Sequence, residues 1–234
     1  MTQGIIRMRI IFIRHGNPDY ALDCLTELGH RQAEAAAEVL CTMGIEKIFA
    51  STHGRAIETA EHTATKLGYD IEGCDFIREL TSRRKDDPTL PWSPEYSAWR
   101  RLLEYERRNL PLLDPKWRDH ELFADIDTVD CIDKTCCGLD GWLSSLGVER
   151  EGIYYRLNEP KYDTVAMFCH AMSYSASMAH MFNLTFPFVS LAMPMPQSAI
   201  TVIEFTGEEG ALVTPRILKI GCVDHLKKSG IEIT

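Results

Sequence analysis

The feature that most constrains the fold is an alternation of short apolar runs with longer amphipathic stretches. Residues 8–13 (MRIIFI) are β-branched and aromatic, and they predict a buried strand. Residues 26–43 predict a helix, residues 45–50 a second strand and residues 54–67 a second helix. Each predicted helix is followed directly by a glycine, Gly44 or Gly68. This order is typical of a parallel sheet with crossover helices.

The same alternation of predicted strands and helices returns in the last third of the sequence. Residues 164–169 predict a strand, residues 171–182 a helix, and residues 199–205 and 212–220 two late strands. Two glycines, Gly207 and Gly210, lie between the late strands, so we expect these strands to pair as a hairpin. The whole pattern predicts an α/β fold: a three-layer α/β/α sandwich with a mostly parallel central sheet.

Residues 83–162 interrupt the alternation. They contain the charged run RRKDD, several prolines and two stretches that look helical, 96–109 and 128–147. A minimal domain of this kind needs roughly 150–170 residues on ordinary domain scaling. The chain has 234 residues, and most of the surplus lies in this segment. We therefore expect one domain over residues 1–234, with residues 83–162 as a largely helical cap or lid inserted into it.

The charge and the apolar runs exclude two classes of partner. Lys plus Arg total 25 and Asp plus Glu total 34, which gives a net charge of −9. A nucleic-acid binder would normally be basic, so we expect no nucleic-acid partner. The apolar run near the N-terminus contains three arginines, and prolines interrupt residues 184–203. Because a membrane span needs roughly 20 uninterrupted apolar residues, we expect no signal peptide, no membrane partner and a cytoplasmic location.

The cysteines indicate neither a metal nor a disulfide framework. All eight are scattered, and none forms a CxxC pair. Cys131, Cys136 and Cys137 lie close together in the sequence, which would suit a metal or redox site, but free thiols in a reducing cytosol are the interpretation we favour. No metal-ligand spacing and no nucleotide-binding glycine loop stands out. The sequence therefore predicts no metal and no cofactor.

Polar clusters follow three of the predicted strands. They are Arg14-His15-Gly16, residues 51–60 and Cys169-His170-Ala171. Open α/β sheets bind ligands just past the carboxyl ends of their strands, so we expect these clusters to meet. Guanidinium groups match phosphate oxygens, and a neutral imidazole beside them is a nucleophile for phosphorus. The three clusters together favour phosphoryl chemistry.

At this point the sequence closely resembles the histidine phosphatase superfamily, which contains cofactor-dependent phosphoglycerate mutases and many small phosphatases. The RHG signature of that family stands here as Arg14-His15-Gly16. Its SxxxRAxxTA signature stands as Ser51, Arg55, Ala56, Thr59 and Ala60. Its LTxxGxxQA helix start stands as Leu25, Thr26, Gly29, Gln32 and Ala33. The second histidine is His170, and residues 197–205 (QSAITVIEF) resemble a late strand of the family.

The resemblance implies a role for each catalytic residue. His15 would be the nucleophile and form a phosphohistidine intermediate. Arg14, Arg55 and His170 would hold the phosphoryl oxygens and neutralise the charge of the transition state. Glu79 matches the acidic residue that typically follows the third strand of the family, and it would act as general acid and base. Four other carboxylates remain alternatives for that role: Glu72, Asp75, Asp86 and Asp87.

Three further residues are candidates for substrate binding. Asn17 could donate a hydrogen bond to a phosphate oxygen, or it could instead cap the following turn. Arg83 and Arg84 could bind a second anionic group, although a charge run is more often a solvated face. His53, just before Arg55, is interpreted as a surface loop histidine.

Two departures from the family pattern bear on the reaction. Ala171 stands where the family often has glycine after the second histidine. Residues 17–24 are short and lack the Arg–aromatic–Thr/Ser–Gly stretch of the mutases, which favours hydrolysis. The leading hypothesis is a metal-independent phosphatase acting on a small phosphorylated metabolite. The alternatives are a phosphoglycerate-type phosphomutase and a catalytically weak protein that binds a phosphate ligand. The sequence identifies no particular substrate, and it leaves a homo-oligomer open.

Overall fold

A central sheet organises the molecule. The computed structural model describes residues 4–87, 89 and 93–234. Within these ranges six strands form the main sheet, in the order β11-β9-β1-β8-β4-β5. They are β1 (Ile5–Arg14), β4 (Lys47–Ser51), β5 (Ile71–Cys74), β8 (Thr164–Cys169), β9 (Ile200–Glu208) and β11 (Arg216–Cys222). β1, β8, β4 and β5 are parallel neighbours, and β9 pairs antiparallel with both β1 and β11. The expected mostly parallel sheet is confirmed.

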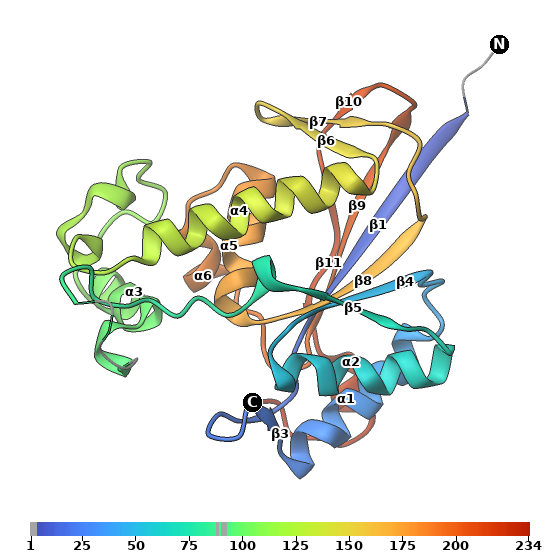
Figure 1. The fold of residues 1–234 in the computed structure, drawn as a ribbon, viewed down its shortest axis with the longest axis horizontal. Coiled ribbons are helices and arrows are strands. Elements are labelled where there is room, and N and C mark those ends of the chain that lie inside the picture. Colours follow the sequence, from blue (N-terminus) through green and yellow to red (C-terminus); the bar gives the residue numbers. More distant parts are fainter. Residues whose placement is uncertain (1–3, 88, 90–92) are drawn as a thin grey trace.

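Helices cover both faces of this sheet (Figure 1). α1 (Glu27–Leu40) and α2 (Gly54–Leu67) lie on one face. α4 (Thr128–Ser145) and α5 (Ala171–Phe182) lie on the other. This arrangement is the expected three-layer α/β/α sandwich. Short helices α6 (Phe186–Ala192) and α7 (Asp224–Lys228) complete the later part of the chain. No helix in the described ranges is long and apolar enough to cross a membrane.

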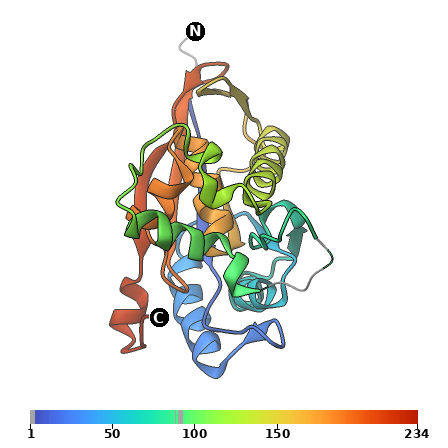
Figure 2. The same ribbon diagram turned by 90° about the vertical axis from the view of Figure 1, so that its left-hand side faces the viewer.

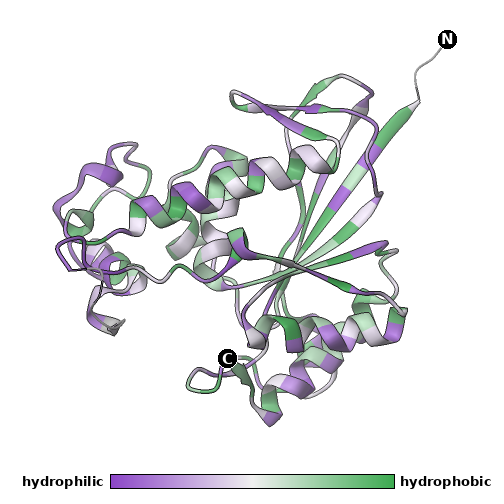
Figure 3. Ribbon diagram, in the orientation of Figure 1, coloured by the Kyte–Doolittle hydropathy of each residue, from purple (hydrophilic) through white to green (hydrophobic). Residues whose placement is uncertain are grey.

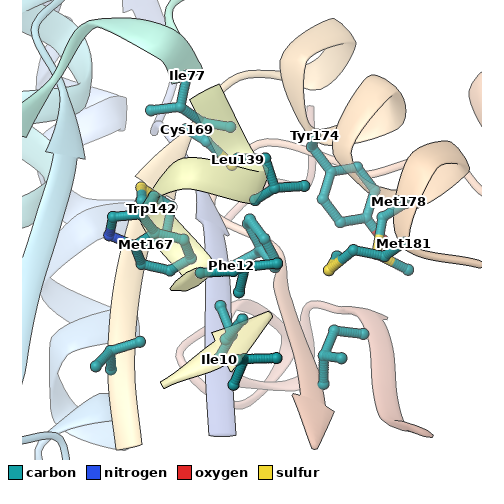
Figure 4. Packing of buried hydrophobic residues seen from close by; sticks show 14 of the residues in the cluster. Ile10, Phe12, Ile77, Leu139, Trp142, Met167, Cys169, Tyr174, Met178 and Met181 are labelled. Atoms are coloured by element: carbon teal, nitrogen blue, oxygen red, sulfur yellow. The ribbon is translucent and has the colours of Figure 1, made fainter. Parts of the chain in front are cut away.

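The alternation of side chains along β1 explains why its apolar run is continuous. Ile10 and Phe12 face one core, with residues of α4 and α5 (Figure 4). Ile11 and Ile13 face the other core, with α1 and α2. A parallel strand covered on both faces must be apolar where it is buried, and Figure 3 shows green stretches along the central strands, interrupted on β1 by hydrophilic residues.

Several element boundaries match the expectations from the sequence. β8, α2 and α5 span the expected residues. Gly68, with φ of 70°, ends α2 in the left-handed conformation. The late hairpin is different: β9 pairs with β11, whereas β10 (Leu212–Val213) pairs with another strand, β7 (Tyr154–Leu157). Pro215 lies between β10 and β11 and has no N–H to continue a ladder, which accounts for the break.

The segment 83–162 is divided between two packing clusters. α3 (Ala98–Arg107) and the 3₁₀ turns Trp117–Asp119 and Glu121–Phe123 build a separate cluster with the start of α4 and with residues of α5 and α6 (Figure 2). The second half of α4 and the strand β7, which pairs with β6 (Val148–Glu151), pack into the main core. The expected cap boundaries stay a prediction. The separate cluster occupies the earlier part of the segment.

The start of α1 lies in close contact with the loop after β1. Thr26 caps α1 by accepting a hydrogen bond from the Gly29 N–H, and its own N–H donates to the Asn17 carbonyl at 3.0 Å. A Cβ added at Gly29 would lie 2.2 Å from the Asn17 carbonyl oxygen, and one at Gly16 would lie 2.6 Å from the Gly29 carbonyl oxygen. Only glycine at these two positions allows the backbones to approach this closely.

We predict that Gly29→Ala destabilises the protein by about 1–3 kcal/mol, because the new methyl group must push the loop after β1 away. Gly141→Ala is the matched control, since Gly141 lies in α4 with nothing within 4 Å of an added Cβ. There the same change should stabilise by about 0.4–1 kcal/mol. Urea unfolding of both variants measures the two effects. Equal effects of the two substitutions would contradict the prediction.

Candidate active site

Three neighbouring parallel strands deliver the predicted site residues to one edge of the sheet. β1 ends at Arg14, next to the end of β8 at Cys169, and β4 lies on the other side of β8. The ring centroids of His15 and His170 are therefore only 5.0 Å apart. His53, which follows β4, lies 5.1 Å from His170. These distances bring the three strand ends together at one edge of the sheet, as expected from the sequence.

The imidazole of His15 is held as a neutral ring with one free nitrogen. Its Nδ1 lies 2.7 Å from the Gly16 carbonyl, which can only accept, so Nδ1 carries the proton. Its Nε2 therefore keeps a lone pair, and this atom is buried and makes no hydrogen bond within the described chain. Burial and the neighbouring Arg14 lower the pKa of His15 to about 3. At neutral pH the His15 ring is thus neutral, and the lone pair on its Nε2 needs no deprotonation to become available.

His170 is held in a similar way by a different partner. Its Nε2 lies 2.7 Å from the Ser51 hydroxyl at the end of β4. Its Nδ1 is buried and makes no hydrogen bond to any described residue. Burial, and then His15, lower the pKa of His170 well below its ordinary value. A Ser51 hydroxyl that donates to Nε2 leaves the proton on Nδ1, which can then donate to a ligand oxygen.

Each of the two arginines is held by one terminal nitrogen. Nη1 of Arg14 donates to the Met195 carbonyl at 2.8 Å. Nη1 of Arg55 donates to the carboxylate of Asp23, and Arg55 is 6% exposed. The Nε of each arginine is buried and has no partner among the described residues. Both guanidinium groups are thus fixed and retain a donor for an anion.

Four polar atoms at these three strand ends are therefore buried without a hydrogen-bond partner within the described ranges. They are Arg14 Nε, His15 Nε2, Arg55 Nε and His170 Nδ1. An unsatisfied buried donor or acceptor costs about 1–3 kcal/mol, and proteins contain few of them. Four such atoms in one place indicate a site built for a ligand, and cationic donors beside an imidazole suit a phosphoryl group.

Glu79 lies at the edge of this cluster, beside the start of α5. Its Oε1 accepts hydrogen bonds from the N–H groups of Leu80, Met172 and Ser173, at 3.0–3.3 Å. Burial raises the pKa of Glu79 above its ordinary value, against the opposing charge of Arg14. Because Arg14 and Arg55 both act on its ionisation, Glu79 is close to the anion-binding donors.

The alternative carboxylates have other partners. Glu72 pairs with Lys47, Asp75 accepts from Thr52 and Asp86 pairs with Arg84. Asp87 accepts from Thr89. These contacts favour Glu79 over them as the acid of the site.

The three predicted substrate-binding residues have protein partners. The Asn17 amide donates to Gln197 Oε1 at 3.0 Å and accepts from the Thr26 hydroxyl at 2.7 Å. It thereby ties the loop after β1 to the cap of α1. Arg84 pairs with Asp86 and lies over the ring of Tyr96, whereas the Arg83 N–H donates to Asp127. Substrate binding by Asn17, Arg83 and Arg84 stays a prediction.

Sequence reasoning missed several residues that shape the site. Asp23 pairs with Arg55 and with Nδ1 of His53, so His53 is half-buried rather than a surface loop histidine. Ser51 holds His170, and the Thr59 hydroxyl accepts from the Gly16 N–H at 3.1 Å. Ser51 and Thr59 belong to the quoted motif, but its spacing does not reveal their contacts with other strand ends. Asp23 belongs to no motif quoted from the sequence.

Comparison with known proteins finds a family match over part of the chain. A model of the histidine phosphatase superfamily (branch 1) matches residues 10–104. Over these residues the chain is similar to the histidine phosphatase superfamily. The match includes the RHG and SxxxRAxxTA signatures, so the similarity rests on residues that lie in the site described above.

Relatives that match part of this chain have been named as protein phosphatases. The serine/threonine-protein phosphatase Pgam5, mitochondrial, of Drosophila persimilis is 36% identical over 100 residues. The Pgam5 protein of Drosophila melanogaster is 35% identical over 102 residues. Each alignment covers 38–39% of this chain, and the chain spans only 35% of the length of these relatives.

Solved structures share the fold of this chain over nearly its whole length. A mycobacterial glucosyl-3-phosphoglycerate phosphatase has a TM-score of 0.63 at 21% identity, covering 92% of this chain and 99% of its own. An Entamoeba histolytica phosphoserine phosphatase has a TM-score of 0.61 at 17% identity, covering 94% and 99%. At such identities these likenesses show the fold alone.

The low pKa of His15 makes the stability of the protein depend on pH. Between pH 6.5 and about 3 the unfolded chain binds a proton at His15 that the folded chain does not, so stability falls as the pH falls through this window. From pH 7.5 to pH 5 this loss amounts to about 2 kcal/mol for one histidine. We predict that His15→Gln loses less stability over this range by about that amount. Urea unfolding at both pH values, in phosphate-free buffer, measures the difference; parallel losses in both proteins would contradict it.

Proposed function

We propose that this protein is a phosphoric monoester hydrolase that works through a phosphohistidine intermediate on His15. The observation that carries the proposal is the set of four buried, unpartnered atoms described above, with a carboxyl group of raised pKa beside them. The match of residues 10–104 to the histidine phosphatase superfamily and the phosphatase names of similar proteins support it.

In the first step, the lone pair on His15 Nε2 attacks the phosphorus atom. The bond from phosphorus to the ester oxygen breaks, and protonated Glu79 gives its proton to the departing oxygen, so an alcohol leaves. The donors of Arg14, Arg55 and His170 bind the phosphoryl oxygens, where negative charge gathers in the transition state. No step needs a metal, and no three metal-ligating side chains come together in the described residues.

In the second step, a water molecule attacks the phosphohistidine. Glu79, now a carboxylate, takes a proton from the water as the new oxygen–phosphorus bond forms. The nitrogen–phosphorus bond breaks, and its electron pair returns to His15 Nε2. The products are inorganic phosphate, neutral His15 and protonated Glu79, so the site is restored.

We propose a small phosphorylated metabolite as the substrate class. Two fold neighbours are named for such compounds, a glucosyl-3-phosphoglycerate and phosphoserine. The Pgam5 relatives are named for phosphorylated proteins, so a phosphoserine peptide is the second class to test. A panel of phosphorylated metabolites and phosphopeptides at fixed protein concentration distinguishes the two.

The nucleophile is tested by His15→Ala. We expect this change to abolish release of phosphate from p-nitrophenyl phosphate, and activity of the unchanged protein to survive EDTA. Rapid quenching of the unchanged protein with labelled substrate should trap an acid-labile phosphoenzyme, absent from the variant. His30→Ala, an exposed histidine of α1, is the control. EDTA-sensitive activity without a phosphoenzyme would refute the proposal.

The role of Glu79 is tested by comparing leaving groups in Glu79→Gln. An alkyl phosphate such as phosphoserine needs a proton on its leaving oxygen, so formation of the phosphoenzyme should slow about 10²–10⁴-fold. Nitrophenolate leaves without needing a proton, so p-nitrophenyl phosphate should still give a rapid burst of nitrophenolate as the phosphoenzyme forms. Later turnover should be slow, because Glu79 is no longer present as a base for the attacking water. Glu72→Gln, which alters an exposed carboxylate paired with Lys47, is the control. Equal slowing of phosphoenzyme formation with both substrates would show that Glu79 is not the acid that protonates the leaving oxygen.

A further inference from the structure

The short loop between β2 (Pro18–Asp19) and β3 (Cys24–Leu25) contacts the anion-binding arginine Arg55. At its end, Asp23 accepts three hydrogen bonds: from Arg55 Nη1, from the Gly54 N–H at 2.9 Å and from His53 Nδ1 at 3.2 Å. At its start, the ring of Tyr20 lies 5.4 Å from the guanidinium carbon of Arg55. The loop therefore holds this guanidinium between a carboxylate and an aromatic ring.

The backbone of the loop is shaped to make these contacts. Asp23 has φ of 53°, in the left-handed region that few residues other than glycine, Asn and Asp adopt. A Cβ added at Gly54 would lie 2.2 Å from the Asp23 carbonyl oxygen, so the first residue of α2 must be glycine for the loop to approach. Two unusual backbone positions thus bring one carboxylate to Arg55.

The carboxylate of Asp23 is ionised at working pH. Burial opposes its ionisation, but the hydrogen bonds from Gly54 and His53 and the charge of Arg55 outweigh that effect and hold its pKa below the ordinary value. A charged carboxylate on Arg55 could compete with phosphate for the guanidinium. However, it occupies Nη1 and leaves Nε buried and without a partner in the described chain. Because Asp23 takes one donor of Arg55 and leaves another for an anion, the contact orients the guanidinium group rather than competing with phosphate for it.

We infer that Asp23 is a positioning residue, which fixes the guanidinium of Arg55 so that its remaining donors meet the phosphoryl group. The inference rests on the proposed function, because it takes Arg55 as a ligand of the phosphoryl group. Asp23 acts through Arg55 and does not itself contact substrate. Its contribution should therefore vanish when Arg55 is absent, whereas a merely structural role would persist.

The test is a double-mutant cycle with p-nitrophenyl phosphate. Asp23→Ala should lower kcat/KM about 10- to 100-fold, the usual result of misplacing a group that binds the transition state. In an Arg55→Ala background the same change should cause no further loss. Asp23→Asn keeps an accepting oxygen and tolerates the left-handed φ, so its loss should be smaller. This variant also decides the matter if Asp23→Ala fails to fold.

Asp19→Asn is the charge-matched control. Asp19 lies in β2, where its Oδ1 accepts from the N–H groups of Ala21 and Leu22, and the amide oxygen of Asn can replace it. This variant should keep the activity of the unchanged protein.

Binding of inorganic phosphate, measured by calorimetry, gives a second readout that does not depend on turnover. Asp23→Ala should weaken phosphate binding in the Arg55 protein and leave it unaltered in the Arg55→Ala protein. If the unchanged protein hydrolyses no ester, the proposed function fails, and this measurement alone decides the role of Asp23. Equal losses in both backgrounds would overturn the inference. So would tighter phosphate binding with undiminished kcat/KM, which would make Asp23 a competitor of phosphate.

Discussion

The site depends on keeping unpartnered polar groups inside a folded protein. Two imidazole rings and two guanidinium groups each leave one buried atom without a hydrogen-bond partner in the described structure. Leaving such atoms unpaired costs free energy, so the surrounding structure must hold them in place. Parallel strands provide that support, because β1, β8 and β4 end side by side and are fixed by apolar packing on both faces.

Backbone groups provide much of the finer control. The Gly16 carbonyl determines which nitrogen of His15 carries the proton, and the Met195 carbonyl holds Arg14. The same Gly16 donates its N–H to Thr59 of α2 and lies against Gly29 of α1. One residue therefore links the tautomer of His15, the proposed nucleophile, to both helices on that face of the sheet. This coupling explains why glycine is needed there for both packing and chemistry.

Local patterns predicted the parts of the structure that local forces determine. β8 and α5 have the expected bounds, because a doubly buried strand and a helix with a polar start are visible in a short window of sequence. The pairing of β10 with β7 was not predictable, since no local signal names a partner strand. Ser51 and His170 are 119 residues apart, and Asp23 and Arg55 are 32 apart. Only the fold reveals which side chains orient the proposed catalytic residues.

The same desolvated environment shifts both partners of the proposed reaction toward the protonation state that they need. Burial disfavours charge on either group, so it lowers the pKa of His15 and raises the pKa of Glu79. Burial thus favours a neutral imidazole with a free lone pair at His15 and shifts Glu79 toward the carboxylic acid, the form that has a proton to give. The first step turns Glu79 into a carboxylate, which is the base that the second step requires. Asp23, more exposed and bound by three donors, stays ionised beside them, so it can hold Arg55 without entering the proton transfers.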